Sequence, residues 1–164
     1  MTTFQKRMIG YASYHRDPRN KFTHLFGVPM VFYSPLIALG WLRLQIGSFE
    51  LSAALVVLVA VMFWYLILEW KLGTLMSIIS VPAFYLCDMV SRLPFTQSLA
   101  IFLGLTVVGW TIQLIGHVFE GKRPALVDNL SQSLMGPLFV LTEVLNFFGF
   151  RKDLERLAHA EMHA

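Results

Sequence analysis

Four long apolar runs limit what this chain can fold into. They cover about residues 25–46, 51–68, 74–90 and 98–119. As helices, runs of this length can cross a hydrocarbon core of roughly 30 Å. The hydrophobic fraction of 56% and the mean hydropathy of +0.62 exceed what a soluble core of this size can use. The sequence therefore predicts an all-α, polytopic helical membrane protein with about four transmembrane helices.

A further apolar segment, at about residues 131–150, differs from the four runs. Gly136 and Pro137 stand near its start, and Glu143 and Asn146 share one face of the helix that it would form. Polar groups make a poor lipid-facing surface, so we expect a re-entrant or bundle-packed helix. Residues 1–164 then form a single integral membrane domain made of a cytoplasmic arm (1–24), four spans (25–119), and a polar hinge, a packed apolar helix and a charged tail (120–164).

Positive charge predicts the orientation in the membrane. Of the 13 Lys and Arg residues, all except Arg43 and Arg92 fall on the side that holds both termini if the chain crosses four times. Basic segments favour the cytoplasm, so both termini are expected there, in a bacterial inner membrane or in the endoplasmic reticulum of a eukaryote. The net charge of +3 therefore indicates topology and lipid headgroup contact, not nucleic-acid binding.

Two histidines stand in the polar stretch that leads into the first span. His15 and His24 are nine residues apart, which on a continuous helix would put their rings on opposite faces. Pro18 interrupts that helix, because it removes a backbone donor and disfavours a helical conformation at the preceding residue. With Asn20 as the N-cap of a helix that starts at Lys21, His24 lies one turn along, on the same face as Asn20. Two short elements could then bring both imidazoles to one point.

The fourth span carries a polar stripe. Gln113, His117 and Glu120 follow one another at steps of four and three on an otherwise apolar helix. Ionisable groups in such a position usually face the bundle interior or water. Because an even number of predicted spans separates His24 from His117, both histidines belong to the cytoplasmic end of the bundle.

One interpretation of this clustering is a site for a divalent transition metal. The candidate ligands are His15, His24, His117, Glu120 and Glu143. Imidazole and carboxylate ligands that leave positions open suit a non-haem Fe(II) centre. Glu120 could instead orient a ligand, and each histidine could simply cap a helix end. The single cysteine, Cys87, excludes a cysteine-rich zinc site.

Basic side chains surround the same layer of the bundle. They are Arg16, Arg19, Lys21, Lys122 and Arg123. Such a rim could bind the carboxylate of a substrate. Solvated charges that only set the topology are the alternative.

The two polar blocks resemble the Mpo1-like family. The resemblance rests on Tyr14-His15, Asn20, Thr23-His24 and Gly27-Val28-Pro29 in the first block, on Gln113, Gly116-His117, Phe119-Glu120-Gly121 and Arg123-Pro124-Ala125-Leu126 in the second, and on the later Pro137, Phe139 and Glu143. It covers nearly the whole chain, and the histidine blocks show no departure from the family pattern.

The resemblance implies an Fe(II)-dependent dioxygenase that acts on 2-hydroxy fatty acids. His15, His24 and His117 match the family's histidines and are the best candidates for iron ligands. The implied reaction, a step of α-oxidation, uses O₂ to cleave the C1–C2 bond and leaves a fatty acid one carbon shorter. The substrate would chelate the iron through its hydroxyl and carboxylate oxygens, with its acyl chain between the apolar helices.

Two other functions fit the same residues. A bis-imidazole haem carrier would place two histidines on facing helices. A small transporter or lipid-binding protein would line a polar path with Glu143, Asn146 and the stripe on the fourth span. Small residues such as Gly104 and Gly109 permit close helix contact, and with it a homo-oligomer.

Overall fold

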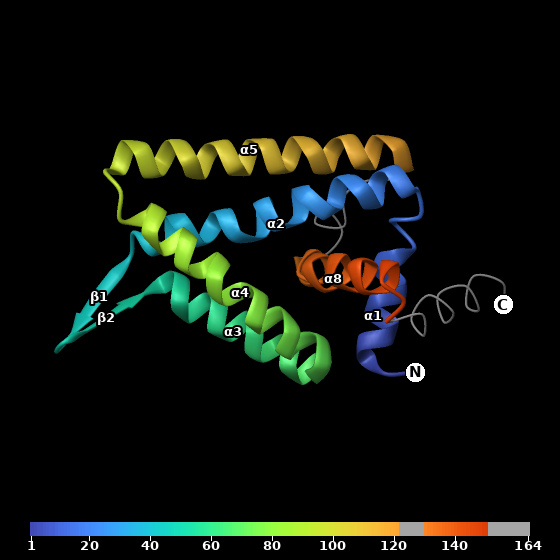
Figure 1. Ribbon diagram of the computed structural model, residues 1–164, viewed down its shortest axis with the longest axis horizontal. Helices are drawn as coiled ribbons and strands as arrows, with labels where there is room; N and C mark the ends of the chain where they lie inside the picture. Colours follow the sequence, from blue (N-terminus) through green and yellow to red (C-terminus); the bar gives the residue numbers. More distant parts are fainter. Residues whose placement is uncertain (122–129, 151–164) are drawn as a thin grey trace. The chain divides into compact units, whose positions relative to one another are not determined.

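The computed structural model describes residues 1–121 and 130–150, most of which are helical (Figure 1). Along the chain the elements are α1 (Thr3–Ala12), α2 (Pro18–Gly40), β1 (Arg43–Ile46), β2 (Phe49–Ser52), α3 (Ala53–Leu68), α4 (Trp70–Ser91), α5 (Phe95–Glu120), α7 (Leu130–Ser133) and α8 (Gly136–Phe147). The predicted polar hinge, with Lys122 and Arg123, and the charged tail lie outside the described residues.

The chain divides into two compact units, and each is described by itself. The first, here called the terminal unit, consists of Met1–Val28 and Ile112–Ala164. The second, the central unit, is Pro29–Thr111. The long helices α2 and α5 contribute residues to both units.

Three of the described helices are long and apolar enough to cross a membrane. They are α2, α4 and α5, with 23, 22 and 26 residues. Two further apolar helices are shorter, since α3 has 16 residues and α8 has 12. At 1.5 Å per residue, α8 is only about 18 Å long and falls short of a bilayer core. This length agrees with the prediction of a packed helix near the C-terminus in place of a fifth span.

The first predicted span is too long at its C-terminal end, because α2 stops at Gly40 and a β-hairpin follows. The strands β1 and β2 pair antiparallel, with Arg43 opposite Ser52. Polar and apolar side chains alternate along β1 (Arg43-Leu44-Gln45-Ile46), which is the period of a strand. Gly47 closes the hairpin with a φ of 62°, a conformation that glycine adopts without strain.

Within the central unit, α3 and α4 pack as an antiparallel pair, coloured green to yellow-green in Figure 1. Glu69 alone separates the two helices, whereas the predicted runs 51–68 and 74–90 left residues 69–73 between them. Its carboxylate accepts a hydrogen bond from the Leu72 backbone N–H at 2.6 Å and so caps α4. Gly73 allows the close turn, because a Cβ there would lie 2.6 Å from the Leu66 backbone nitrogen. The pair therefore forms one tight helical hairpin.

Within the central unit, α2 and α5 meet in part through small and polar side chains. The α5 residue Gly109 packs on Met30 of α2, where an added Cβ would come within 2.8 Å of the Met30 Cβ. Thr106 donates a hydrogen bond to Ser34 at 3.0 Å. The close helix contact predicted for Gly109 is therefore made with α2 of the same chain.

The terminal unit begins with α1, a sharp turn and the start of α2. Thr2 and Gln5 form a capping box at the N-terminus of α1. The predicted break at Pro18 is confirmed, but α2 already starts there and not at Lys21. Proline suits the first position of a helix, and the Asp17 carboxylate caps it by accepting from the Arg19 backbone N–H at 2.8 Å. Asn20 is consequently inside the first turn, and it is not the N-cap.

The core of the terminal unit lies between α1 and α8. Its buried side chains are Phe4, Met8, Tyr11, Met135, Leu138 and Phe139. The rings of Tyr11 and Phe139 lie 5.0 Å apart between centroids. Tyr11 is thus a core residue of the terminal unit.

Candidate metal centre

Three buried histidines meet in the terminal unit. His15 lies in the turn after α1, His24 in the second turn of α2, and His117 in the last turn of α5. Their exposed fractions are 1%, 1% and 5%. One ring nitrogen from each can be chosen so that all three lie within 4.8 Å of one another. The prediction that His117 comes together with His15 and His24, almost a hundred positions earlier in the sequence, is confirmed.

The backbone fixes which nitrogen of His15 and His24 faces the centre. The Nδ1 of His15 lies 2.9 Å from the Tyr11 carbonyl oxygen, and that of His24 lies 2.9 Å from the Asn20 carbonyl oxygen. A carbonyl oxygen can only accept, so both Nδ1 atoms carry the proton and donate it. In the neutral rings both Nε2 atoms then bear a lone pair. These two Nε2 atoms face each other at 3.1 Å.

Two lone pairs at this distance repel unless a positive charge lies beside them. Burial, with a smaller contribution from His24, lowers the pKa of His15 to about 3, so a proton on His15 does not solve the problem near neutral pH. A bound metal ion would remove this repulsion, since two neighbouring ligand atoms at about 2.1 Å from a metal are about 3 Å apart. The hydrogen bonds from Nδ1 to carbonyl oxygens also match the partners that orient histidine ligands in metal sites. The three residues therefore fit a metal ion.

The same geometry argues against a haem held between His15 and His24. Two axial ligands stand on opposite sides of the iron, about 4 Å apart, with the porphyrin between them. The rings of His15 and His24 instead touch edge to face, with centroids 4.5 Å apart. Each also contacts His117, at 5.2 and 5.0 Å between centroids. No porphyrin can enter between rings that are in direct contact.

Glu120 lies beside the histidines but does not join their group of ligand atoms. Its Oε2 accepts hydrogen bonds from the backbone N–H of Arg16 at 2.9 Å, from that of Asp17 at 2.8 Å, and from Asn20 Nδ2 at 3.1 Å. These donors all belong to the turn that carries His15 and to the start of α2. Glu120 thus ties the end of α5 to the segment that positions two histidines.

Small and aromatic residues complete the surroundings. Gly116 is required by close approach, since a Cβ there would lie 2.6 Å from Asn20 Oδ1 and even closer to Thr23 Oγ1. The Tyr11 ring stacks on His15 at 4.2 Å with an angle of 5° between the planes. Sequence reasoning missed this role of Tyr11, although its position four residues before His15, one helical turn, was an available signal.

The other predicted site residues that the structure describes are paired elsewhere or exposed. Glu143 on α8 pairs with Lys21 at 3.1 Å and is not among the grouped ligand atoms. Arg19 pairs with Asp17 at 2.8 Å and lies over the Phe119 ring at 4.5 Å. Arg16 is exposed. Among the described residues of the predicted basic rim, Lys21 lines a groove that is described below.

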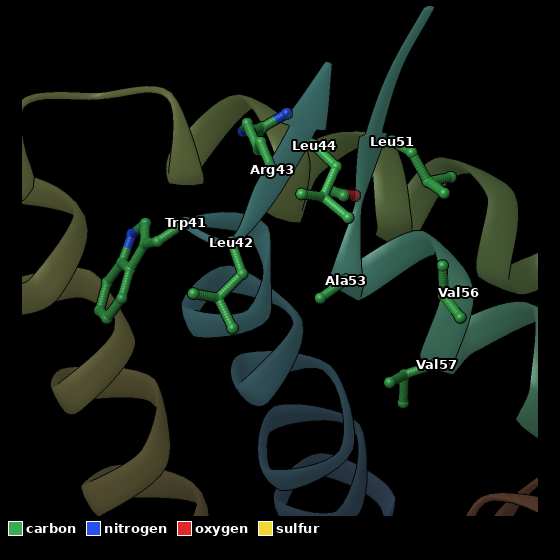
Figure 2. A pocket seen from close by; sticks show the side chains of 9 residues that line it. Trp41, Leu42, Arg43, Leu44, Leu51, Ala53, Val56 and Val57 are labelled. Atoms are coloured by element: carbon green, nitrogen blue, oxygen red, sulfur yellow. The ribbon is translucent and has the colours of Figure 1, made fainter. Parts of the chain in front are cut away.

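A different hollow, in the central unit, lies at the base of the β-hairpin. Figure 2 shows Trp41, Leu44, Leu51 and Val56 among the side chains that line its roughly 560 Å³. Its one charged lining residue, Arg43, already pairs with Glu50 at 2.8 Å and Asp88 at 2.9 Å. This hollow offers an apolar surface and no cluster of reactive groups.

Comparisons with known proteins identify the family of the chain. The family model "2-hydroxy-palmitic acid dioxygenase Mpo1-like" matches residues 1–148. A curated relative, the 2-hydroxy-palmitic acid dioxygenase MPO1 of Saccharomyces cerevisiae (strain ATCC 204508 / S288c), is 36% identical over 149 residues. The match covers 88% of this chain and 81% of the relative. No solved structure matches the chain. The chain belongs to the Mpo1-like family.

Proposed function

We propose that this protein is a 2-hydroxy fatty acid dioxygenase that uses Fe(II) and O₂. The product is a fatty acid one carbon shorter than the substrate, formed by cleavage of the C1–C2 bond. The observation that carries this proposal is the pair of Nε2 lone pairs from His15 and His24, which face each other at 3.1 Å beside His117. The activity named for the yeast relative supports the choice of substrate class.

His15, His24 and His117 would hold the iron. When bound, Fe(II) supplies an electron donor with open positions for a chelating 2-hydroxy acid and for oxygen. With O₂ as the sole oxidant, the atoms of a 2-hydroxy acid balance as the shortened fatty acid, carbon dioxide and water. No organic co-substrate is needed for this balance.

The protein's own groups would orient the ligands and keep the site dry. The carbonyl oxygens of Tyr11 and Asn20 hold the His15 and His24 rings in the tautomer that presents Nε2. Tyr11 and Phe139, both buried, cover His15 from the side of α1 and α8. Glu120 acts as a positioning residue, because its carboxylate is already engaged by three donors. Excluding water strengthens every charge interaction at the site.

We also propose four membrane crossings with both termini in the cytoplasm. His24 and His117 share one site near the ends of two candidate spans, α2 and α5. The chain between them must therefore cross an even number of times. The helices α3 and α4 form one tight hairpin, so they either cross together or not at all. The excess of basic residues on the side of the termini favours crossing together and a cytoplasmic site.

The experiment is metal analysis followed by turnover in detergent-purified protein. We expect iron close to one atom per chain and conversion of 2-hydroxypalmitate to pentadecanoate under air, detected by mass spectrometry. His117→Ala should lose iron and activity together, whereas His163→Ala, outside the described residues, serves as the matched control. Full turnover by His117→Ala, or by protein without iron, would rule out this function.

A further inference from the structure

We propose that a groove between the start of α2 and α8 binds the acyl chain of the substrate acid and sets its preferred length. This inference rests on the proposed function, because it assigns a place to that substrate. The groove lies entirely within the terminal unit. Its α2 wall consists of Lys21, Phe22 and Leu25, and its α8 wall consists of Phe139, Val140, Glu143, Val144, Phe147 and Phe148.

The size and lining of the groove fit a single alkyl chain. Its volume is about 400 Å³, within the roughly 300–1,000 Å³ of small-molecule sites. Aliphatic and aromatic side chains supply nearly all of its wall. Phe22, Phe147 and Phe148 are more than half exposed, at 65%, 86% and 66%. An apolar ligand would cover part of this surface.

Charge at the groove points to a carboxylate at one end of the ligand. Lys21 and Glu143 are the charged groups among the described residues that line it, and they pair at 3.1 Å. Their side chains are 36% and 31% exposed, so the pair is held weakly and can open. A ligand carboxylate could take the place of Glu143 at the Lys21 ammonium. One cation beside one apolar trough fits a single-chain monocarboxylate better than a phospholipid, which brings a second chain and a phosphate.

One side chain, Phe139, lies between the groove and the histidines. Phe139 lines the groove, is 3% exposed, and lies 5.5 Å from the His15 ring between centroids. On α2, Lys21 precedes His24 by three residues and so neighbours it on the helix surface. Phe139, Glu143 and Phe147 follow at steps of four along one face of α8, so the groove runs outward from the histidines. A chain in the groove would present its carboxylate end to the candidate metal centre.

Chain-length preference is one test of this assignment. Val144→Trp would fill the groove, whereas Val118→Trp places the same ring on α5, at a position that is 77% exposed and does not line this groove. We expect Val144→Trp to shift the ratio of turnover from 2-hydroxypalmitate towards shorter 2-hydroxy acids by about tenfold or more. Its iron content should stay unchanged. An identical chain-length profile for the two variants would overturn the assignment.

A binding experiment separates this inference from the proposed reaction. A 2-hydroxy fatty acid with a mid-chain diazirine is cross-linked to iron-free protein, and the labelled peptides are identified by mass spectrometry. We expect labels on α8 near Val140 and Val144, reduced by excess 2-hydroxypalmitate. Lys21→Met should weaken labelling and Lys21→Arg restore it, with Lys71→Met as the control. Labels elsewhere, or labels that excess acid does not displace, would refute the groove, whereas labelling of α8 without turnover would refute only the reaction.

Discussion

Gly116 sets how closely α5 approaches α2 beside the histidines. A Cβ at this position would clash with Thr23 Oγ1 and lie 2.6 Å from Asn20 Oδ1. Gly116→Ala is therefore expected to destabilise the protein by about 1–3 kcal/mol and to lower its iron content, because His117 is the next residue. Gly104→Ala is the matched control, since nothing lies within 4 Å of its Cβ. Thermal unfolding in detergent compares the stability of the two variants, and equal midpoints would contradict the close contact.

Glu120 tests whether the carboxylate positions the site or binds the metal. Glu120→Gln keeps the shape but loses the charge that attracts the Arg16 and Asp17 backbone N–H groups. If Glu120 only positions the site, Glu120→Gln should lower the metal affinity by about 10- to 100-fold. A high iron concentration should then restore the activity of the variant. Glu69→Gln, which weakens a helix cap in the central unit, should leave iron affinity unchanged. Irreversible loss of iron in Glu120→Gln would indicate a direct ligand instead.

At the residue scale, the sequence predicted those features of the site that depend on the spacing of residues along the chain. The Pro18 break predicted that His15 and His24 converge, and the even number of predicted spans between His24 and His117 added the third histidine. Spacing could not decide the role of Glu120, because a carboxylate one turn from a histidine can equally bind a metal or accept backbone hydrogen bonds. Nor could it separate Glu143 from the site, since its ion pair with Lys21 depends on how α8 packs.

Among the elements, the β-hairpin shows where hydropathy alone fails. Residues 43–46 contain Leu44 and Ile46 and follow directly on the first apolar run, so a long window includes them in the span. The alternation of Arg43 and Gln45 with apolar residues, followed by Gly47, indicates a strand and a turn instead. Helix starts were misplaced by a few residues for a related reason, since Asp17 and Pro18 together cap a helix better than Asn20 does.

The hairpin is held to α4 by a network of four charges, which makes its stability depend on pH. Glu50 pairs with Arg43 and Arg92, and Asp88 pairs with the same two arginines. Hydrogen bonds from Arg43, and next from Arg92, lower the pKa of Glu50 below its ordinary value of 4.5. A lowered pKa in the folded state means that the stabilisation is complete above the unfolded value and is lost as the pH falls through the folded one.

Glu50→Gln is accordingly expected to reduce the acid sensitivity of the fold. Between pH 6 and pH 3, the wild-type thermal midpoint in detergent should fall further than that of the variant, because only the wild type protonates this carboxylate. Gln45→Ala changes the residue paired across the strand and carries no charge, so it should keep the wild-type response. An equal fall in all three proteins would show that the network does not act through Glu50.

At the scale of the whole molecule, helix length and charge lead to different numbers of crossings. By length, three helices can span, and α3, at 16 residues, is about 24 Å long. Yet a site built from the ends of α2 and α5 requires an even number of crossings between His24 and His117. The number of crossings stays even only if α3 and α4 both cross the membrane or neither does. The prediction of one membrane domain over residues 1–164 stays a prediction, because the two units are each compact.

Accessibility of single cysteines to a membrane-impermeant maleimide distinguishes these topologies. Cys87→Ser removes the one native cysteine, and new cysteines are placed at Thr2, Ser48 and Lys71, all exposed. Four crossings predict that Thr2→Cys and Lys71→Cys label from the cytoplasmic side and Ser48→Cys from the opposite side. If Lys71→Cys labels from neither side, the α3–α4 hairpin enters the bilayer without crossing it. If Thr2→Cys and Ser48→Cys label from the same side, α2 is not a span, and a metal centre at its cytoplasmic end loses its topological basis.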